Sequence, residues 1–99
     1  MSILAVLGML DDRILTFANA DAQYDSTRML VLFKGYDDKR AVLCGISQEA
    51  LEDHFDVDNK DPVKTFRASR ERIEHEARRK YLARRLESDG SVLIKTEDL

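Results

Sequence analysis

One arginine stands out among the residues whose type and spacing could do chemistry. When the region after Pro62 is drawn as a helix, Arg70 falls on the same face as Phe66 and Ile73. A guanidinium on an apolar stripe must find a partner or reach solvent along its own methylene stem. Glu74 follows one turn later, and side chains of a preceding short helix come within reach if the two helices pack together. The candidate site therefore comprises Arg70, Glu74, His54 and Asp53.

This cluster has two interpretations. Half-buried arginines are usually paired, so an ion pair that fixes the angle between the two helices is favoured. The alternative is a small-molecule site, which requires a concave pocket where these groups converge.

Charge is distributed unevenly along the chain. Residues 49–61 carry six acids against one lysine, a net charge of −5, whereas residues 78–86 carry +5. A local basic surface can contact phosphates, so nucleic-acid binding is an alternative function. The overall charge of −3 and the lack of aromatic residues interleaved with the basic ones, beyond Tyr81, favour a solvated or protein-facing surface. The candidate basic patch is Arg78, Arg79, Lys80, Arg84 and Arg85.

The sequence gives little support for a metal site, a phosphate-binding loop or a reactive thiol. Cys44, His54 and His75 are the only Cys and His residues, and their spacing fits no metal site. The acidic run 56–61 starts like a calcium loop but has Asp61 where glycine is required. Cys44 lies mid-strand, where it packs as a small hydrophobe rather than acting as a nucleophile. We therefore predict no metal, no cofactor and no enzymatic activity.

The elements that position these residues follow from the pattern of apolar, glycine and capping residues. An apolar run predicts a strand at 14–17, and polar residues 19–26 predict a turn. Residues 28–34 and 40–46 form a predicted hairpin around a turn at 35–39. Ser47 caps a short helix. Asp61 and Pro62 start a helix that reaches about residue 87, roughly 39 Å at 1.5 Å per residue. Residues 91–95 close the chain as a strand.

These elements predict an α+β fold: a small, mainly antiparallel sheet of about four strands packed on one short and one long helix. Residues 13–99 form a single domain, and residues 1–12 are an N-terminal extension outside the core fold. Both faces of the hairpin are apolar, and one helical layer covers only one of them. Either residues 3–10 or a second subunit must cover the other, and the second alternative predicts a homodimer. A single cysteine and the lack of an apolar run of about 20 residues favour a cytoplasmic protein without a membrane span.

Several short motifs in a fixed order resemble a bacterial family, the domain of unknown function numbered fourteen eighty-eight. The motifs are Val42-Leu43-Cys44-Gly45-Ile46-Ser47, Glu49-Ala50-Leu51-Glu52-Asp53-His54-Phe55, the spaced residues Phe66, Arg70, Ile73, Glu74, Ala77 and Lys80, then Asp89-Gly90-Ser91-Val92-Leu93-Ile94 and Glu97-Asp98-Leu99. The resemblance covers residues 14–99 and implies a small α+β domain with no established activity. The preferred function is a non-enzymatic accessory module that binds protein partners, itself included.

Overall fold

A computed structural model of the chain describes residues 15–17, 22–55 and 61–99. The predicted extension at 1–12 and most of the calcium-like run lie outside these residues. The strands are β1 (Thr16–Phe17), β2 (Gln23–Asp25), β3 (Leu30–Asp37), β4 (Arg40–Ser47) and β5 (Val92–Ile94), and the helices are α2 (Gln48–His54), α3 (Pro62–Ala68), α4 (Arg70–Leu82) and the 3₁₀ turn η1 (Thr96–Asp98).

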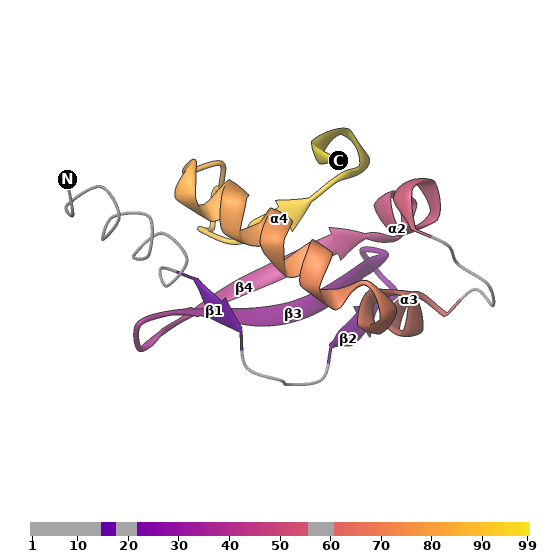
Figure 1. Cartoon of the computed structure of the whole chain (residues 1–99), viewed down its shortest axis with the longest axis horizontal. Coiled ribbons are helices and arrows are strands. Elements are labelled where there is room, and N and C mark those ends of the chain that lie inside the picture. Colours follow the sequence, from indigo (N-terminus) through magenta and orange to yellow (C-terminus); the bar gives the residue numbers. More distant parts are fainter. Residues whose placement is uncertain (1–14, 18–21, 56–60) are drawn as a thin grey trace, which may run out of the picture.

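The sheet has β3 and β4 at its centre. They form an antiparallel hairpin, β1 and β2 both pair antiparallel with β3, and β5 pairs parallel with β4. A parallel neighbour needs a crossover, and the three helices between β4 and β5 supply it (Figure 1). The predicted α+β class and mainly antiparallel sheet are confirmed, with five strands rather than four.

Two predictions about the strands are wrong. The stretch predicted as a polar turn contains β2, which forms because β3 offers it a hydrogen-bonding edge. The turn between β3 and β4 is only Asp38 and Lys39, with Asp38 at φ 57°. Gly35 stays inside β3 because a Cβ there would lie 3.0 Å from Leu15 Cδ1 and 3.1 Å from the Phe17 ring. The glycine marks a close approach of β1 side chains rather than a turn.

The helix starts are as predicted. Ser47 Oγ accepts the Ala50 amide at 3.0 Å, and Asp61 Oδ1 accepts the Lys64 amide at 3.2 Å. Each side-chain oxygen thereby satisfies a donor that the first helical turn leaves without a partner.

The single long helix predicted after Pro62 is wrong in two respects. It breaks at Ser69, whose φ of −119° and ψ of 23° separate α3 from α4, and it ends at Leu82. The bend turns Phe66 of α3 and Ile73 of α4 onto the same core, where both side chains are fully buried.

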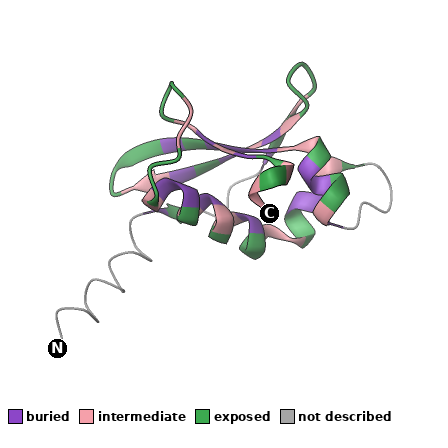
Figure 2. Cartoon of the chain, turned by 90° about the horizontal axis from the view of Figure 1, so that it is seen from above, coloured by how far each residue is buried: buried purple, intermediate pink, exposed green. Residues whose placement is uncertain are grey.

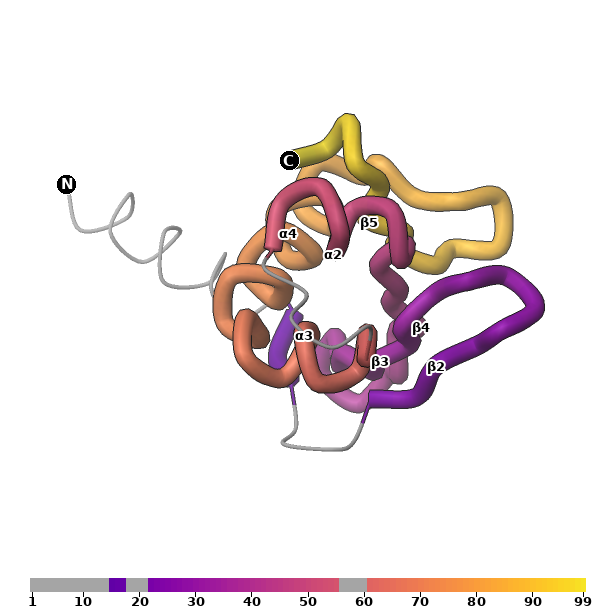
Figure 3. Tube along the Cα trace, turned by 90° about the vertical axis from the view of Figure 1, so that its right-hand side faces the viewer, coloured from indigo at the N-terminus to yellow at the C-terminus, as the bar shows by residue number. Residues whose placement is uncertain are grey.

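The described helices all lie on one face of the sheet. Figure 3 shows them on one side, while the β2–β3 turn and the α4–β5 loop project from the other. Figure 2 shows the same two loops, well apart, on the side of the sheet away from the helices, with buried residues between the sheet and the helices. The core packs Phe33 of β3 against Phe66 with ring centroids 4.8 Å apart. One face of the sheet is therefore covered, and the other lies between two loops.

Candidate functional site

Arg70 forms its ion pair within α4. Its Nε lies 3.0 Å from Glu74 Oε2, both side chains are mostly buried, and the guanidinium stands 5.3 Å from the centroid of the Phe66 ring. A depression of about 570 Å³ adjoins Arg70, and the described residues that line it are 67–72. These residues are consecutive at the bend between α3 and α4, so the described lining brings no groups together from distant parts of the chain, as a small-molecule site needs.

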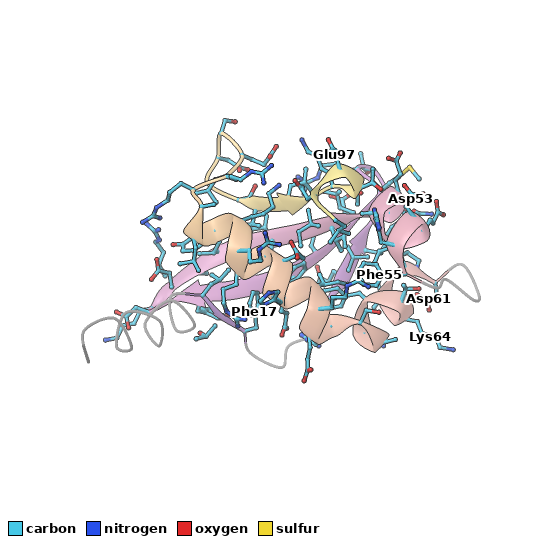
Figure 4. All side chains as sticks on the ribbon, turned by 45° about the horizontal axis from the view of Figure 1, so that its top comes forward. Phe17, Asp53, Phe55, Asp61, Lys64 and Glu97 are labelled. Atoms are coloured by element: carbon cyan, nitrogen blue, oxygen red, sulfur yellow. The ribbon has the colours of Figure 1, made fainter. Side chains whose placement is uncertain are left out.

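His54 and Asp53 hold the C-terminal turn instead. His54 Nε2 lies 3.0 Å from the Thr96 carbonyl oxygen, and the Thr96 hydroxyl donates to Asp53 Oδ2 at 2.6 Å. Figure 4 shows Asp53 and Glu97 at the end of the molecule where α2 meets η1. Among the described residues, the hydrogen bonds of this pair link α2 to η1, and none joins it to Arg70 or Glu74.

The candidate basic patch is largely engaged with the protein itself. Arg78 donates to the Leu15 carbonyl at 3.0 Å, Arg79 pairs with Glu76 at 2.9 Å, and Arg85 reaches Asp98 at 3.4 Å. The guanidinium of Arg84 stands 5.7 Å from the Tyr81 ring centroid. Lys80 is buried, with its ammonium 2.7 Å from both Asp98 Oδ2 and the Leu93 carbonyl oxygen. A phosphate backbone could not reach Lys80 without disrupting the fold.

The thiol of Cys44 lies in the core. It is fully buried, and burial raises its pKa to about 12. A thiol with this pKa carries almost no thiolate at neutral pH and is a poor nucleophile. In the part of the chain that the structure describes, no group of three or more His, Cys, Asp or Glu side chains is arranged to hold a metal ion.

A concave surface that the sequence did not single out lies on the face of the sheet away from the described helices. We call it the leucine trough, a depression of about 360 Å³. Its floor is made of Leu30 and Leu32 of β3, Leu43 and Gly45 of β4, and Leu93 of β5. A Cβ on Gly45 would lie 3.4 Å from Leu32 and 3.7 Å from Leu30 and Leu93, so the leucines lean together over the glycine.

Charged loops form the two walls of the trough. The β2–β3 turn contributes Arg28, whose Nε donates to Asp25 at 2.8 Å. The opposite loop contributes Glu87 and Asp89, among others. Ser91 donates to Asp89 through both its amide and its hydroxyl, and these bonds lower the pKa of Asp89. The trough therefore combines an apolar floor with one basic and one acidic wall.

Only part of this surface could be found in the sequence. The apolar residues on both faces of the hairpin indicated that the far face needs a cover. The walls come from loops nearly sixty residues apart, and only the sheet brings them together.

The fold is thus an α+β domain with helices on one face of its sheet and a leucine-floored trough on the other. The chain belongs to the family described as a protein of unknown function (DUF1488), whose model matches residues 15–94. The structure is similar to the crystal structure of a protein of unknown function from this family from Shewanella loihica PV-4, with a TM-score of 0.72. The two chains are 18% identical over 83% of this chain and 92% of that one, which shows a shared fold. A comparison with curated proteins found no significant match. No helix in the described ranges is long and apolar enough to cross a membrane.

Proposed function

We propose that this domain is a non-enzymatic protein-interaction module and that it self-associates through the leucine trough. The observation that carries the proposal is the apolar floor on the face of the sheet that none of the described elements covers. Leu43 is 42% exposed there, although it stands in a central strand. Exposed apolar clusters bounded by polar rims are typical of protein interaction sites.

The charges around the trough support a second copy of this chain as the occupant. Under two-fold symmetry, the turn that carries Arg28 can enter the partner's trough beside the partner's Glu87 and Asp89. Met29 in the same turn is 53% exposed and adds an apolar side chain to that contact. The surface is thus self-complementary, with a basic and apolar turn next to an apolar and acidic trough.

The groups that could support catalysis have structural partners, which favours binding over chemistry. Arg70 pairs with Glu74, His54 and Asp53 fasten the C-terminal turn, and the Cys44 thiol is buried. We place the module in the cytoplasm because its single cysteine is a free thiol, as expected in a reducing compartment.

Sedimentation velocity of the full chain at concentrations up to the high micromolar range tests the proposal. We expect a dimer for the natural sequence and about tenfold or more weakening of the dimer for Leu43→Asp, because a carboxylate would be buried among leucines. Ala68→Asp, at an exposed position on α3, is the matched control and should leave the dimer unchanged. A monomeric natural sequence, or a Leu43→Asp dimer of unchanged affinity, would overturn the proposal.

A charge exchange tests the pairing of the walls. Arg28→Asp and Asp89→Arg should each weaken the homodimer, because each places like charges together across the interface. A mixture of the two variants should recover a mixed dimer, because both of its wall contacts again pair opposite charges. Equal weakening in the mixture and in each variant alone would contradict this arrangement.

A further inference from the structure

A second surface lies at an unpaired edge within the sheet. All eight residues of β4 pair with β3, but β5 pairs only with Cys44, Gly45 and Ile46. On the β5 side, residues 40–43 therefore have no neighbouring strand among the described residues. Backbone groups of successive strand residues alternate between the two neighbours, so part of this stretch directs its N–H and C=O groups to the unpaired side.

The loop before β5 leaves a slot beside this edge. The slot has a volume of about 440 Å³ and is lined on one side by residues 40–43. Its other side is formed by Tyr81 of α4, by Leu86 and by residues 89–91. The amide of Glu87 donates to the Ser91 carbonyl at 2.9 Å, which closes the loop on itself. The loop thus turns away just before the point where β5 begins to pair with β4.

The slot differs from the outer edge of β5. There the ammonium of Lys80 donates to the Leu93 carbonyl at 2.7 Å, so a lysine occupies a backbone acceptor that another strand could use. Natural proteins commonly protect sheet edges in this way. Residues 40–43 lack such protection from the described residues. Within the described part of the chain, the one side chain that donates to their backbone is the buried thiol of Cys44, which lies 3.7 Å from the Val42 carbonyl oxygen.

The lining indicates what would fit. Val42, Tyr81 and Leu86 make the inner side apolar, and Leu43 makes the outer side apolar, so an inserted strand would contact apolar groups with both faces. At one end Arg40 donates to the Tyr81 hydroxyl at 3.1 Å and lies 3.9 Å from Asp37. Its side chain is still 73% exposed, and a guanidinium has five N–H donors, so it can donate hydrogen bonds to a further carboxylate.

We propose that residues 40–43 of β4 bind one extended segment of a partner protein, an apolar strand with an acidic residue at the Arg40 end. The segment would add to β4 in line with β5 and take the backbone hydrogen bonds that the loop leaves open. Because the loop walls the slot on its far side, a single strand fits there, whereas the edge of a second sheet does not. This surface shares Leu43, Asp89 and Ser91 with the leucine trough, but the backbone edge that it offers does not depend on self-association.

Amide exchange and chemical-shift mapping by NMR test the proposal on the full chain. The probe is an acetylated, amidated peptide Glu-Val-Ile-Thr-Val-Lys, and its matched control carries N-methyl groups on alternate residues, which removes the donors that a strand needs. We expect the peptide to shift the amides of residues 40–43 and of Gly90 and Ser91, and to slow exchange at residues 40–43. The methylated peptide should bind about tenfold or more weakly, because the backbone bonds supply most of the affinity.

A charge variant tests the Arg40 end. Arg40→Gln should weaken binding of the Glu peptide severalfold and leave binding of a peptide with Gln in place of Glu unchanged. Equal binding of methylated and unmethylated peptides, or no response of residues 40–43 at millimolar peptide, would overturn the proposal. It would also be overturned if all amides of residues 40–43 were protected before any peptide is added. If these amides were protected at every dilution, a segment of the same chain would occupy the slot. If they were protected only at high protein concentration, a second copy of the chain would occupy it.

Discussion

At the scale of single residues, the pair of Lys80 and Asp98 has the largest structural consequence. Both side chains are almost fully buried, and they tie η1 to α4 while Lys80 also reaches the Leu93 carbonyl of β5. Removing one member of a buried pair leaves the other charge without compensation, which costs far more than losing an exposed pair.

Substitution of Lys80 measures this contribution. We expect Lys80→Met to lower the free energy of unfolding by about 3 kcal/mol in urea titrations, because the buried Asp98 carboxylate keeps only the exposed Arg85 guanidinium, at 3.4 Å, as a cationic partner. Arg79→Met removes an exposed pair with Glu76 and should cost less than about 1 kcal/mol. A similar loss for both variants would show that the Lys80 pair is no stronger than a surface contact.

The same pair predicts how stability depends on pH. Burial opposes ionisation of Asp98, but hydrogen bonds from Lys80 and from the Lys95 amide outweigh it and hold the pKa of Asp98 below its ordinary 3.8. A carboxyl whose pKa is lowered by folding stabilises the protein above its unfolded pKa and loses that contribution as the pH falls through the folded value.

Urea unfolding from pH 6 to pH 2 checks this dependence. The difference in unfolding free energy between the natural sequence and Asp98→Asn should be constant above about pH 5 and shrink below about pH 4. A difference that stays constant down to pH 2 would show that Asp98 does not carry the effect.

At the scale of elements, local signals in the sequence predicted the starts of helices better than their ends. Ser47 and Asp61 cap the helices as predicted, because a cap depends on residues within one turn. The break at Ser69 was missed because it satisfies the packing of Phe66 and Ile73 on the sheet, and neither glycine nor proline marks it. For the same reason β2 was missed, since β3 rather than its own composition makes it a strand.

The candidate site shows the same limit. The sequence places Glu74 one turn after Arg70, within reach of its guanidinium, and the structure pairs these two side chains within α4. Placing His54 beside Arg70 required the relative position of two helices, and the structure directs His54 to Thr96 instead.

The end of α4 offers a prediction at this scale. The amides of Arg84 and Arg85 donate to the carbonyls of Tyr81 and Lys80, a Schellman ending in which Arg84 has φ 58°. Glycine is the residue that favours this conformation, and other residues pay a steric cost there. We expect Arg84→Gly to raise the unfolding free energy by about 0.5 kcal/mol. This is the net effect, because relief of the steric cost exceeds the loss of the guanidinium contact with Tyr81. Arg85→Gly is the control and should not stabilise; stabilisation by both would argue against a backbone cause.

At the scale of the whole molecule, the open question is what covers the face of the sheet opposite the helices. Among the described residues the core begins with Leu15, which is fully buried against Gly35 and whose carbonyl accepts a hydrogen bond from the Arg78 guanidinium at 3.0 Å. The family model also begins at residue 15. Both observations favour a second copy over residues 3–10 as the cover.

Removal of residues 1–12 distinguishes the two covers. We expect the shortened chain to keep its unfolding free energy within about 0.5 kcal/mol and to dimerise with an unchanged dissociation constant, because the described core and the family model both begin at residue 15. Urea titration and sedimentation velocity give the two readouts, with Leu43→Asp in the shortened chain as the control for the trough. If residues 3–10 instead cover the leucines, the shortened chain should lose stability, bind an apolar dye and associate more strongly than the full chain. That pattern would show that the chain's own N-terminal segment occupies the leucine trough and that the trough is not a permanent dimer contact.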